Sequence, residues 1–218
     1  MNIIDTRTVN TLRSYNKGAI KNIPLFKLEP LSYELKSKNY TDIIFQSTPS
    51  VEFFNDINLL ENKRVFSMGI STKKSLADKG IDSDSPVFPG SFALNELLKE
   101  NLSNRKFLIV KGLGGLDKIF NYLIKNDAQV HEIICYQRIK FDSYEEIKKL
   151  FKKSDAIIFP STFAAEIFFE KIFSRDLRAK YFAISERIKS FINTLGFEAD
   201  LIDYFSDDVE KSIKNLLS

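Results

Sequence analysis

The same short pattern occurs twice in this chain, at residues 42–54 and again at residues 155–169. Each copy has an acidic residue, a run of apolar residues, a Ser-Thr pair and then a stretch in which apolar residues recur at helical spacing. Such a pattern predicts a buried strand, a tight turn and a helix. The pairs Ser47-Thr48 and Ser161-Thr162 would lie at the two turns.

The likeness continues downstream of both copies. Residues 64–69 lead into a stretch of helical periodicity that stops at Gly80, and residues 180–185 lead into one that stops at Gly196. The spacing from position 69 to 80 equals the spacing from 185 to 196. The chain therefore holds two related α/β units, and such units commonly bind a ligand between them.

Strands and helices are predicted to alternate along most of the chain, which favours parallel sheets. A further strand is predicted at Pro86–Phe88. Residues 25–38 and 136–143 instead alternate apolar and polar side chains, so we expect extended segments that pair with each other. The predicted fold class is α/β, with two flavodoxin-like doubly wound parallel-sheet domains joined by two extended linkers.

The two extended segments set the expected domain limits. Residues 31–37 and 136–143 are the predicted linkers. They would enclose an inserted α/β domain of residues 38–135. Residues 1–30 would combine with residues 144–218 into a discontinuous α/β domain.

Composition excludes several classes of protein. The apolar runs are only as long as strands, and no signal peptide is recognisable, so we expect neither a membrane span nor secretion. Single residues of cysteine (Cys135) and histidine (His131) rule out an internal disulfide and a multi-histidine metal site. A net charge of +3 suits an anionic small molecule better than nucleic acid. A cytoplasmic protein without bound metal is expected.

Six segments share the motifs of one enzyme family: Ile3–Arg7, Phe45–Val51, Met68–Thr72, Phe107–Gly112 with Gly115, Val130–Tyr136 and Phe159–Ser161. The most specific is Met68-Gly69-Ile70-Ser71-Thr72, which is similar to a Val-Gly-x-x-Thr motif. On these segments nearly the whole chain resembles the uroporphyrinogen-III synthase family. It departs from the family at Ser185 and Ile188, where a Gly and a Thr are usual, and at Lys111, where an arginine is usual.

The resemblance implies a specific reaction. The substrate would be hydroxymethylbilane, a linear tetrapyrrole with eight carboxylates, and the product would be uroporphyrinogen III. Ring closure loses water and inverts the last pyrrole ring through a spirocyclic intermediate. Members of the family use no cofactor or metal, and they work as monomers with the substrate between two hinged domains.

Tyr136 is the expected catalytic residue, because it matches the family's tyrosine at the mouth of the second linker. It would assist the loss of the substrate's hydroxyl group by donating a proton. A phenol with a pKa of ~10 is a weak acid, so orienting the substrate could be its larger role. A tyrosine that only packs at a strand end is the alternative.

The turns are the expected substrate-binding elements. Gly69, Ser71 and Thr72 would lie where a helix begins, and free backbone N–H groups at a helix N-terminus favour a carboxylate. Ser47-Thr48 and Ser161 would occupy the corresponding turns. Each of these hydroxyls could also serve only as a helix cap.

Three cations, Arg7, Lys111 and Lys180, could neutralise substrate carboxylates, although a solvated surface charge is the default for any lysine. Gly112 opens a glycine-rich turn through which the backbone could approach a ligand. This turn lacks the spacing of a dinucleotide-binding loop and the lysine of a P-loop, which disfavours a nucleotide-dependent enzyme. The main alternative to a synthase is a non-enzymatic two-domain protein that binds an anionic metabolite in its cleft.

Overall fold

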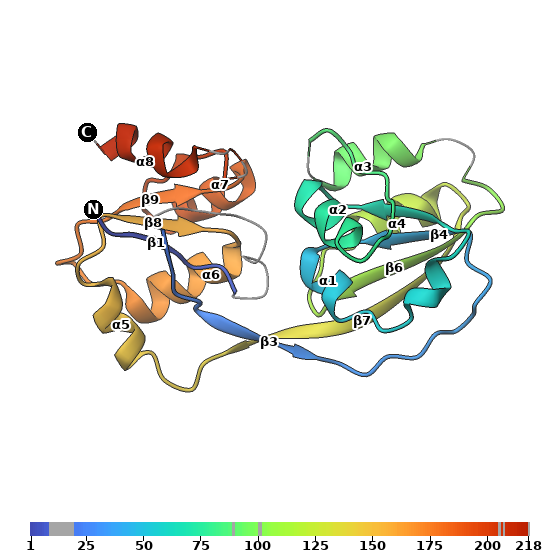
Figure 1. Cartoon of the computed structure of the whole chain (residues 1–218), viewed down its shortest axis with the longest axis horizontal. Coiled ribbons are helices and arrows are strands. Elements are labelled where there is room, and N and C mark those ends of the chain that lie inside the picture. The colour runs from blue at the N-terminus through green and yellow to red at the C-terminus, as the bar shows by residue number, and fades with distance from the viewer. Residues whose placement is uncertain (9–19, 89, 100–101, 205, 207, 218) are drawn as a thin grey trace. The chain divides into compact units, whose positions relative to one another are not determined.

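The structure is a computed structural model, which describes residues 1–8, 20–88, 90–99, 102–204, 206 and 208–217. The chain divides into two compact units, each with its own five-stranded sheet (Figure 1). The first unit comprises Met1–Lys27 and Ile139–Ser218, and the second comprises Leu28–Arg138. The α/β class and the two parallel sheets predicted from the sequence are confirmed.

The predicted linkers are divided between the two units. Residues 31–37 and 136–138 belong to the second unit, and residues 139–143 belong to the first. The expected domain limits, residues 38–135 for one domain and residues 1–30 with 144–218 for the other, stay a prediction. As expected, the strand Phe26–Pro30, which lies in the first alternating segment, is next to the strand Gln129–Lys140, which runs into the second alternating segment.

The sheet of the second unit has the order β3-β7-β6-β4-β5. Its strands are β3 (Phe26–Pro30), β4 (Asp42–Phe45), β5 (Arg64–Ser67), β6 (Lys106–Gly112) and β7 (Gln129–Lys140). Its helices are α1 (Thr48–Glu52), a 3-10 helix η2 (Ile57–Leu60), α2 (Ile70–Ala77), α3 (Ser91–Leu98) and α4 (Lys118–Lys125). The strands β4 to β7 pair in parallel.

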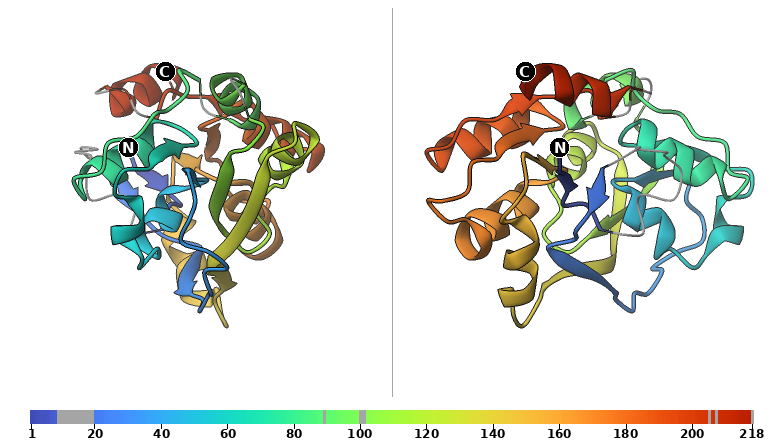
Figure 2. Two further views of the ribbon diagram at one scale, coloured as in Figure 1. Left: turned by 90° about the vertical axis from the view of Figure 1, so that its right-hand side faces the viewer. Right: turned by 60° about the vertical axis from the view of Figure 1, so that its left-hand side comes forward.

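Helices cover both faces of this sheet (Figure 2), because the successive apolar residues Ile43, Ile44 and Phe45 of β4 point to opposite faces. Ile43 and Phe45 face a core that includes Val51 of α1. Ile44 faces a second core that includes Leu94 of α3. This is the doubly wound arrangement expected from the sequence.

The sheet of the first unit has the order β10-β9-β8-β1-β2, and all of its strand pairs are parallel. Its strands are β1 (Ile3–Asp5), β2 (Lys21–Asn22), β8 (Ala156–Phe159), β9 (Lys180–Ala183) and β10 (Asp200–Leu201). Its helices are α5 (Glu145–Phe151), α6 (Thr162–Ile167) with the π-helical turn η3 (Phe168–Ile172), α7 (Glu186–Thr194) and α8 (Val209–Leu217). Among the residues described, none of these helices, nor any in the second unit, has the length and apolar content needed to cross a bilayer.

The repeated sequence pattern folds twice into the same local structure. Ser47 precedes α1 with φ −163° and ψ 160°, and Ser161 precedes α6 with φ −155° and ψ 154°. Each serine Oγ accepts a hydrogen bond from the backbone N–H three residues on, as an N-cap does. The helices of the second strand–helix step end at Ala77 and Thr194, and each is soon followed by a glycine, Gly80 or Gly196, whose φ value of 75° or 84° suits glycine.

The predicted strand at Pro86–Phe88 is wrong. The chain pairs with β5 slightly earlier, through a single parallel bridge between Asp84 and Phe66. Pro86 has no N–H to continue a ladder, and the side chains of Val87 and Phe88 are 90% and 77% exposed. The apolar run predicts a buried strand, but it lies on the surface.

Candidate functional site

The strand order predicts where each sheet binds a ligand. In the second unit the chain runs from β4 to β5 on one side and then returns to β6 on the other side. In the first unit β8 is followed by β9 and β10 on one side, while β1 and β2 lie on the other. A crevice forms at the carboxyl ends of the two strands where the order reverses. The candidate sites are therefore the ends of β4 and β6, and the ends of β1 and β8.

In the second unit the loop after β6 folds against the end of β4. The backbone N–H of Gly115 donates to the carbonyl of Gly112 at 3.0 Å, which closes the turn. The side-chain amide of Gln46 donates to the carbonyl of Leu116 at 3.3 Å. A methyl group at Gly115 would lie 3.2 Å from Gln46 Oε1, so the glycine allows this close approach.

Tyr136 reaches this crevice from the core. Its ring stacks on Phe53 with centroids 5.8 Å apart, and its hydroxyl lies 3.0 Å from Ser47 Oγ. A bulge between Lys111 and Gly112 shifts the register of β6 against β7, so that Gly112 pairs with Tyr136. A Cβ at Gly112 would lie 2.3 Å from the ring carbon Cζ. Gly112 is needed because the tyrosine ring occupies that space.

Ser47 has more than one role in this arrangement. Its Oγ accepts from the backbone N–H of Ser50 at 3.2 Å, and Ser50 Oγ lies 3.1 Å from the backbone N–H of Ser47, which donates to it. This capping box fixes the first turn of α1, where Thr48 is the first helical residue. Ser47 is half-buried, whereas Tyr136 is only 2% exposed. The contacts thus fit both a packing role and a chemical role for Tyr136.

Gly69, Ser71 and Thr72 lie where β5 gives way to α2. Gly69 has an extended backbone, and its carbonyl accepts from the N–H groups of Thr72 and Lys73. Among the described residues no side chain caps this helix start. The first N–H groups of α2 therefore keep their capacity to bind an anion. Thr72 is buried and Ser71 is half-buried.

Lys111 is buried between two carboxylates. Its Nζ lies 2.6 Å from Asp117 Oδ1 and 2.7 Å from Glu132 Oε1. Burial by itself lowers the pKa of Lys111, but the two ion pairs outweigh burial and raise it above its usual value. The two carboxylates thus already neutralise the charge of Lys111. The ion pair with Asp117 also ties the end of β6 to the residue just before α4. A direct contact of Lys111 with a substrate carboxylate would have to displace one of these partners.

The candidate site of the first unit centres on Asp5, which the sequence analysis did not select. Its carboxylate accepts from the backbone N–H of Arg7 at 3.0 Å and from the hydroxyl of Tyr204. The guanidinium of Arg7 lies 4.0 Å from the centroid of the Tyr204 ring. Thr6 donates through its N–H and its hydroxyl to the carbonyl of Ile158, which fixes the end of β1 against β8. Ser161 follows β8 at the same edge.

Asp5 and Tyr204 carried different signals in the sequence. A carboxylate at the end of a buried apolar strand can be recognised in a sequence as a candidate site residue, and Asp5 occupies such a position. Tyr204 belongs to no motif, and its contact with Asp5 joins residues 199 positions apart. Only the packing of the unit brings these two residues together.

The structure does not bring Lys180 to this edge. Lys180 begins β9, opposite Ala156 at the start of β8, so it lies at the amino end of the sheet. Its Nζ donates to the carbonyl of Leu216 in α8 at 2.5 Å. Ser161 lies beyond the opposite, carboxyl end of the same strands. The position just before a strand was expected to be near the ligand, but parallel strands place their two ends on opposite edges.

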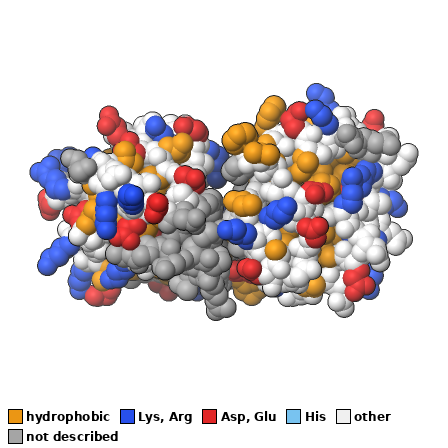
Figure 3. All heavy atoms as spheres, turned by 45° about the horizontal axis from the view of Figure 1, so that its top comes forward, with side chains coloured by type: hydrophobic (Ala, Val, Ile, Leu, Met, Phe, Trp, Pro, Cys, Tyr) orange, Lys and Arg blue, Asp and Glu red, His pale blue; other side chains and the backbone are white. Residues whose placement is uncertain are grey.

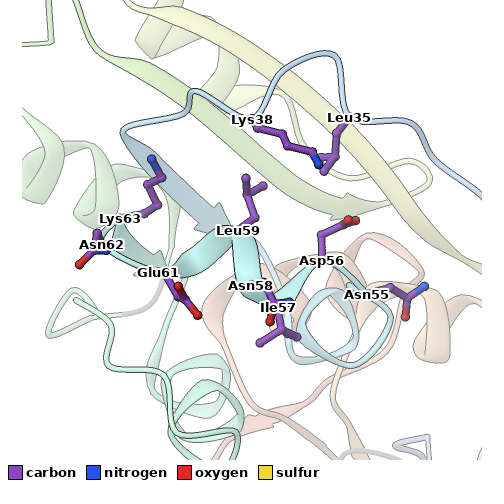
Figure 4. A pocket seen from close by; sticks show the side chains of 10 residues that line it. All are labelled: Leu35, Lys38, Asn55, Asp56, Ile57, Asn58, Leu59, Glu61, Asn62 and Lys63. Carbon is purple, nitrogen blue, oxygen red and sulfur yellow. The ribbon is translucent and has the colours of Figure 1, made fainter.

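A pocket of about 530 Å³ lies elsewhere, beside η2 (Figure 4). Its lining includes Lys38, Lys63, Asp56 and Glu61, so cations and anions surround it together. Most of the residues that line this pocket lie in 55–63, which lead into the amino end of β5. The candidate site lies at the carboxyl ends of the strands, so the pocket is separate from it. Among the described residues no three His, Cys, Asp or Glu side chains gather as metal ligands would.

Comparison with known proteins decides the family. A family model described as uroporphyrinogen-III synthase HemD matches residues 10–204. The chain belongs to the uroporphyrinogen-III synthase family. Membership confirms the enzyme class that the motifs implied, a cyclising lyase of tetrapyrrole biosynthesis. A search of curated protein sequences gives no significant match.

Solved structures share the fold at low sequence identity. The uroporphyrinogen-III synthetase of Helicobacter pylori 26695 is 16% identical with a TM-score of 0.73, over 100% of this chain and 99% of that one. A mutant uroporphyrinogen III synthase of the extremely thermophilic bacterium Thermus thermophilus is 13% identical with a TM-score of 0.61, over 99% of this chain and 98% of that one. At such identities the likeness carries the fold, and the roles of single residues must be argued from this chain.

The departure from the family motif at Ser185 leaves the local backbone unstrained. Ser185 precedes α7 with φ −161° and ψ 154°, an extended conformation that any residue adopts. Gly69, at the equivalent position of the second unit, is extended as well, with φ 178°. A serine therefore replaces the glycine of the family without a backbone penalty, and the helix still begins at the next residue.

Proposed function

We propose that this protein closes hydroxymethylbilane to uroporphyrinogen III, with loss of water and inversion of the last pyrrole ring through a spirocyclic intermediate. The family match over residues 10–204 carries this proposal. The reaction removes water and changes no oxidation state, so it needs no redox cofactor, and we propose that it proceeds without a cofactor or metal, as the resemblance to the family implies. We also propose that the enzyme works as a monomer, as the resemblance to the family implies, and in the cytoplasm, where a free buried thiol such as that of Cys135 stays reduced.

The hydroxyl pair of Ser47 and Tyr136 is the proposed proton source. A serine hydroxyl has one donor and two acceptor positions. The N–H of Ser50 fills one acceptor position of Ser47 Oγ, and the hydroxyl of Tyr136 can fill the other. The single O–H of Ser47 is then directed to the crevice, where it can donate to the hydroxyl that leaves the substrate. Tyr136, buried behind it, is the group that supplies the proton to Ser47.

The proton balance of this step is complete. The bond between the hydroxymethyl carbon and its oxygen breaks, and the oxygen leaves as water with a proton from Ser47. Ser47 takes the proton of Tyr136, which leaves a phenolate near the cationic azafulvene. The substituted α-carbon of the last ring attacks the azafulvene carbon, which forms one carbon–carbon bond and the spirocyclic intermediate. The bond from that α-carbon to its original methylene bridge then breaks and leaves a second azafulvene, which the free α-carbon of the same ring attacks. The proton that this carbon loses when the pyrrole regains aromaticity returns to Tyr136. General acid assistance of this kind is worth about 10²–10⁴-fold in rate.

Carboxylate binding is assigned to the turns at the carboxyl edges. In the second unit the backbone N–H groups of Gly69–Ser71 and of the turn at Thr48 would each donate to a carboxylate. In the first unit Arg7 and Ser161 would do so. Lys111 would act indirectly, by holding the loop that Gly112 opens. Because most of the reaction is folding a flexible chain into one geometry, positioning by these contacts supplies much of the acceleration.

The first test is a coupled assay in which hydroxymethylbilane is generated in situ, the protein is added, and the oxidised porphyrin isomers are separated. Left alone, the bilane closes to isomer I. A dominant isomer III peak without added nucleotide or metal is the expected result. Isomer I alone, from protein shown to be folded by circular dichroism, would contradict the synthase and favour a protein that only binds an anionic metabolite.

A further inference from the structure

Large apolar side chains are exposed at the carboxyl edge of the second unit's sheet. Phe92 is 81% exposed, Phe88 is 77% exposed, and Val87 is more exposed than either. Ile70, Leu113 and Leu116 are about half exposed. These six residues, here called the apolar rim, all lie on the segments that follow β5 or β6 or that lead into α3. Exposed aromatic side chains gathered in one place mark a binding surface.

Backbone contacts place Phe88 and Phe92 at this edge. Asp84 pairs in parallel with Phe66 of β5, so the chain after Asp84 runs toward the carboxyl end of β5. The N–H of Gly90 then donates to the carbonyl of Met68, directly beyond β5. The rim is thus continuous with the helix start at Gly69, where carboxylate binding is proposed. Hydrophobic side chains are visible on the upper surface of the body that contains helices α1–α4 (Figure 3).

The same segments carry no charge in the sequence. Residues 65–72, 85–95 and 112–116 contain no Asp, Glu, Lys or Arg, although 28% of the chain is charged. An uncharged apolar surface does not suit nucleic acid, whose phosphates require cations. It suits flat, apolar rings whose charged groups project outward to neighbouring backbone N–H groups. A linear tetrapyrrole has this form, since its carboxylates hang from the edges of its pyrrole rings.

We propose that the apolar rim binds the pyrrole ring faces of the tetrapyrrole, with Phe88 and Phe92 as the residues that position the rings for closure. This inference rests on the proposed function. Aromatic side chains interact favourably with flat rings, in stacked or edge-to-face arrangements. Rings held in this way would present the substituted carbon of the last ring to the reacting carbon. Without the rim the bilane would leave or close unaided to isomer I.

The experiment compares three double variants with the wild-type protein. Phe88→Ala with Phe92→Ala removes the rings, and Phe88→Tyr with Phe92→Tyr retains them. Leu150→Ala with Leu216→Ala is the control, because these leucines are large, exposed apolar residues on α5 and α8 of the first unit, although less exposed than Phe88 and Phe92. For each variant, KM and kcat for bilane generated in situ and the fraction of isomer III are measured. Fluorescence titration with uroporphyrin III measures binding without turnover.

We expect the alanine pair to raise KM about tenfold or more and to weaken porphyrin binding similarly, as two lost aromatic contacts would. Isomer I should increase, while kcat falls less than KM rises. The tyrosine pair and the leucine control should stay within about twofold of wild type. An alanine pair with unchanged KM and unchanged porphyrin affinity would overturn the inference. So would a wild-type dimer in sedimentation that the alanine pair dissociates, because the rim would then be an interface between two copies.

Failure of the inference and failure of the proposed function give different results. If wild-type protein forms only isomer I, the proposed function fails. The porphyrin titration alone then decides whether the apolar rim binds a tetrapyrrole. Lost affinity in the alanine pair then still supports a tetrapyrrole-binding rim, and unchanged affinity overturns it. If circular dichroism shows that the alanine pair is unfolded, Leu113→Ala with Leu116→Ala tests the same surface by the same measurements.

Discussion

The carboxyl edges of the two sheets share a backbone but differ in their side chains. Both have a strand, a serine N-cap and a helix with nearly the same dihedral angles at Ser47 and Ser161. In the second unit Lys111 is neutralised by two carboxylates, and the adjoining loop segments 65–72, 85–95 and 112–116 carry no charge. In the first unit the adjoining segments carry Asp5, Arg7 and Glu186. A repeated unit thus keeps its turn geometry, which depends on local hydrogen bonds, while its loop side chains are free to diverge.

The largest expected effect is a loss of stability on substitution of Gly112, because the ring of Tyr136 lies directly against this glycine. The described residues of the first unit show no glycine in a comparable position. Gly112→Ala would place a methyl group inside the volume of the Tyr136 ring. We expect the free energy of unfolding of the second unit to fall by about 3 kcal/mol, the upper range for overpacking. Urea denaturation measures this change, with Leu113→Ala as an exposed neighbouring control. An unchanged midpoint would mean that the ring leaves its place easily.

The corresponding test in the first unit is Asp5→Ala. It would leave the N–H of Arg7 and the hydroxyl of Tyr204 without their acceptor. Unsatisfied buried donors and a lost charged acceptor should cost the first unit about 2–3 kcal/mol, whereas Tyr204→Phe, which keeps the packing, should cost about half as much. Denaturation followed by probes in each unit measures both changes. Equal losses in both units would show that the two units do not unfold separately.

The matched serines separate capping from chemistry. Ser47→Ala and Ser161→Ala should each lower stability by about 1 kcal/mol through the lost N-cap. Only Ser47→Ala should also lower kcat, by about 100-fold, because within the described part of the chain Ser47 is the one of the two serines that lies beside a buried tyrosine hydroxyl. The isomer assay and thermal unfolding measure the two effects. An equal loss of kcat in both variants would reduce Ser47 to a cap.

The tyrosine behind Ser47 can be tested against a second buried tyrosine of the same unit. Tyr136→Phe should lower turnover about fivefold and leave the protein folded, a smaller effect than loss of Ser47 because water can restore part of the relay. Tyr40 is buried as well, and its hydroxyl lies 2.9 Å from His131 Nδ1, before the start of β4. Tyr40→Phe should therefore leave turnover unchanged. Unchanged turnover in Tyr136→Phe would refute the proton-donor role.

The smallest expected effect concerns the helix start of α2. Thr72→Ala should weaken the affinity for product about two- to tenfold, as one lost hydrogen bond would. Thr194→Ala, at the end of α7 in the first unit, is the control, since its hydroxyl bonds only within its own helix in the described structure. Titration with product measures both variants. The same affinity for both would leave Thr72 as a structural residue of α2.

Local sequence patterns predicted most of the elements but not all of the site. The Ser47 and Ser161 turns were predictable because a serine followed by helical periodicity fixes its own hydrogen bonds within three residues. The charge of Lys111 was recognised, but its two carboxylate partners come from other elements. Pro86–Phe88 was misread because apolar composition does not reveal whether a segment is covered.

By itself the sequence determined the family, the two α/β units and the turns, and it singled out Tyr136 by its motif. Each of these depends on short-range periodicity or on a motif within a few residues. Only the tertiary structure decided that Tyr204 binds Asp5 across 199 positions and that Lys180 lies at the far edge of its sheet. It also decided that three uncharged segments meet at one edge. The physical reason is that strand order and register, which depend on the packing of the whole unit, set which distant residues become neighbours.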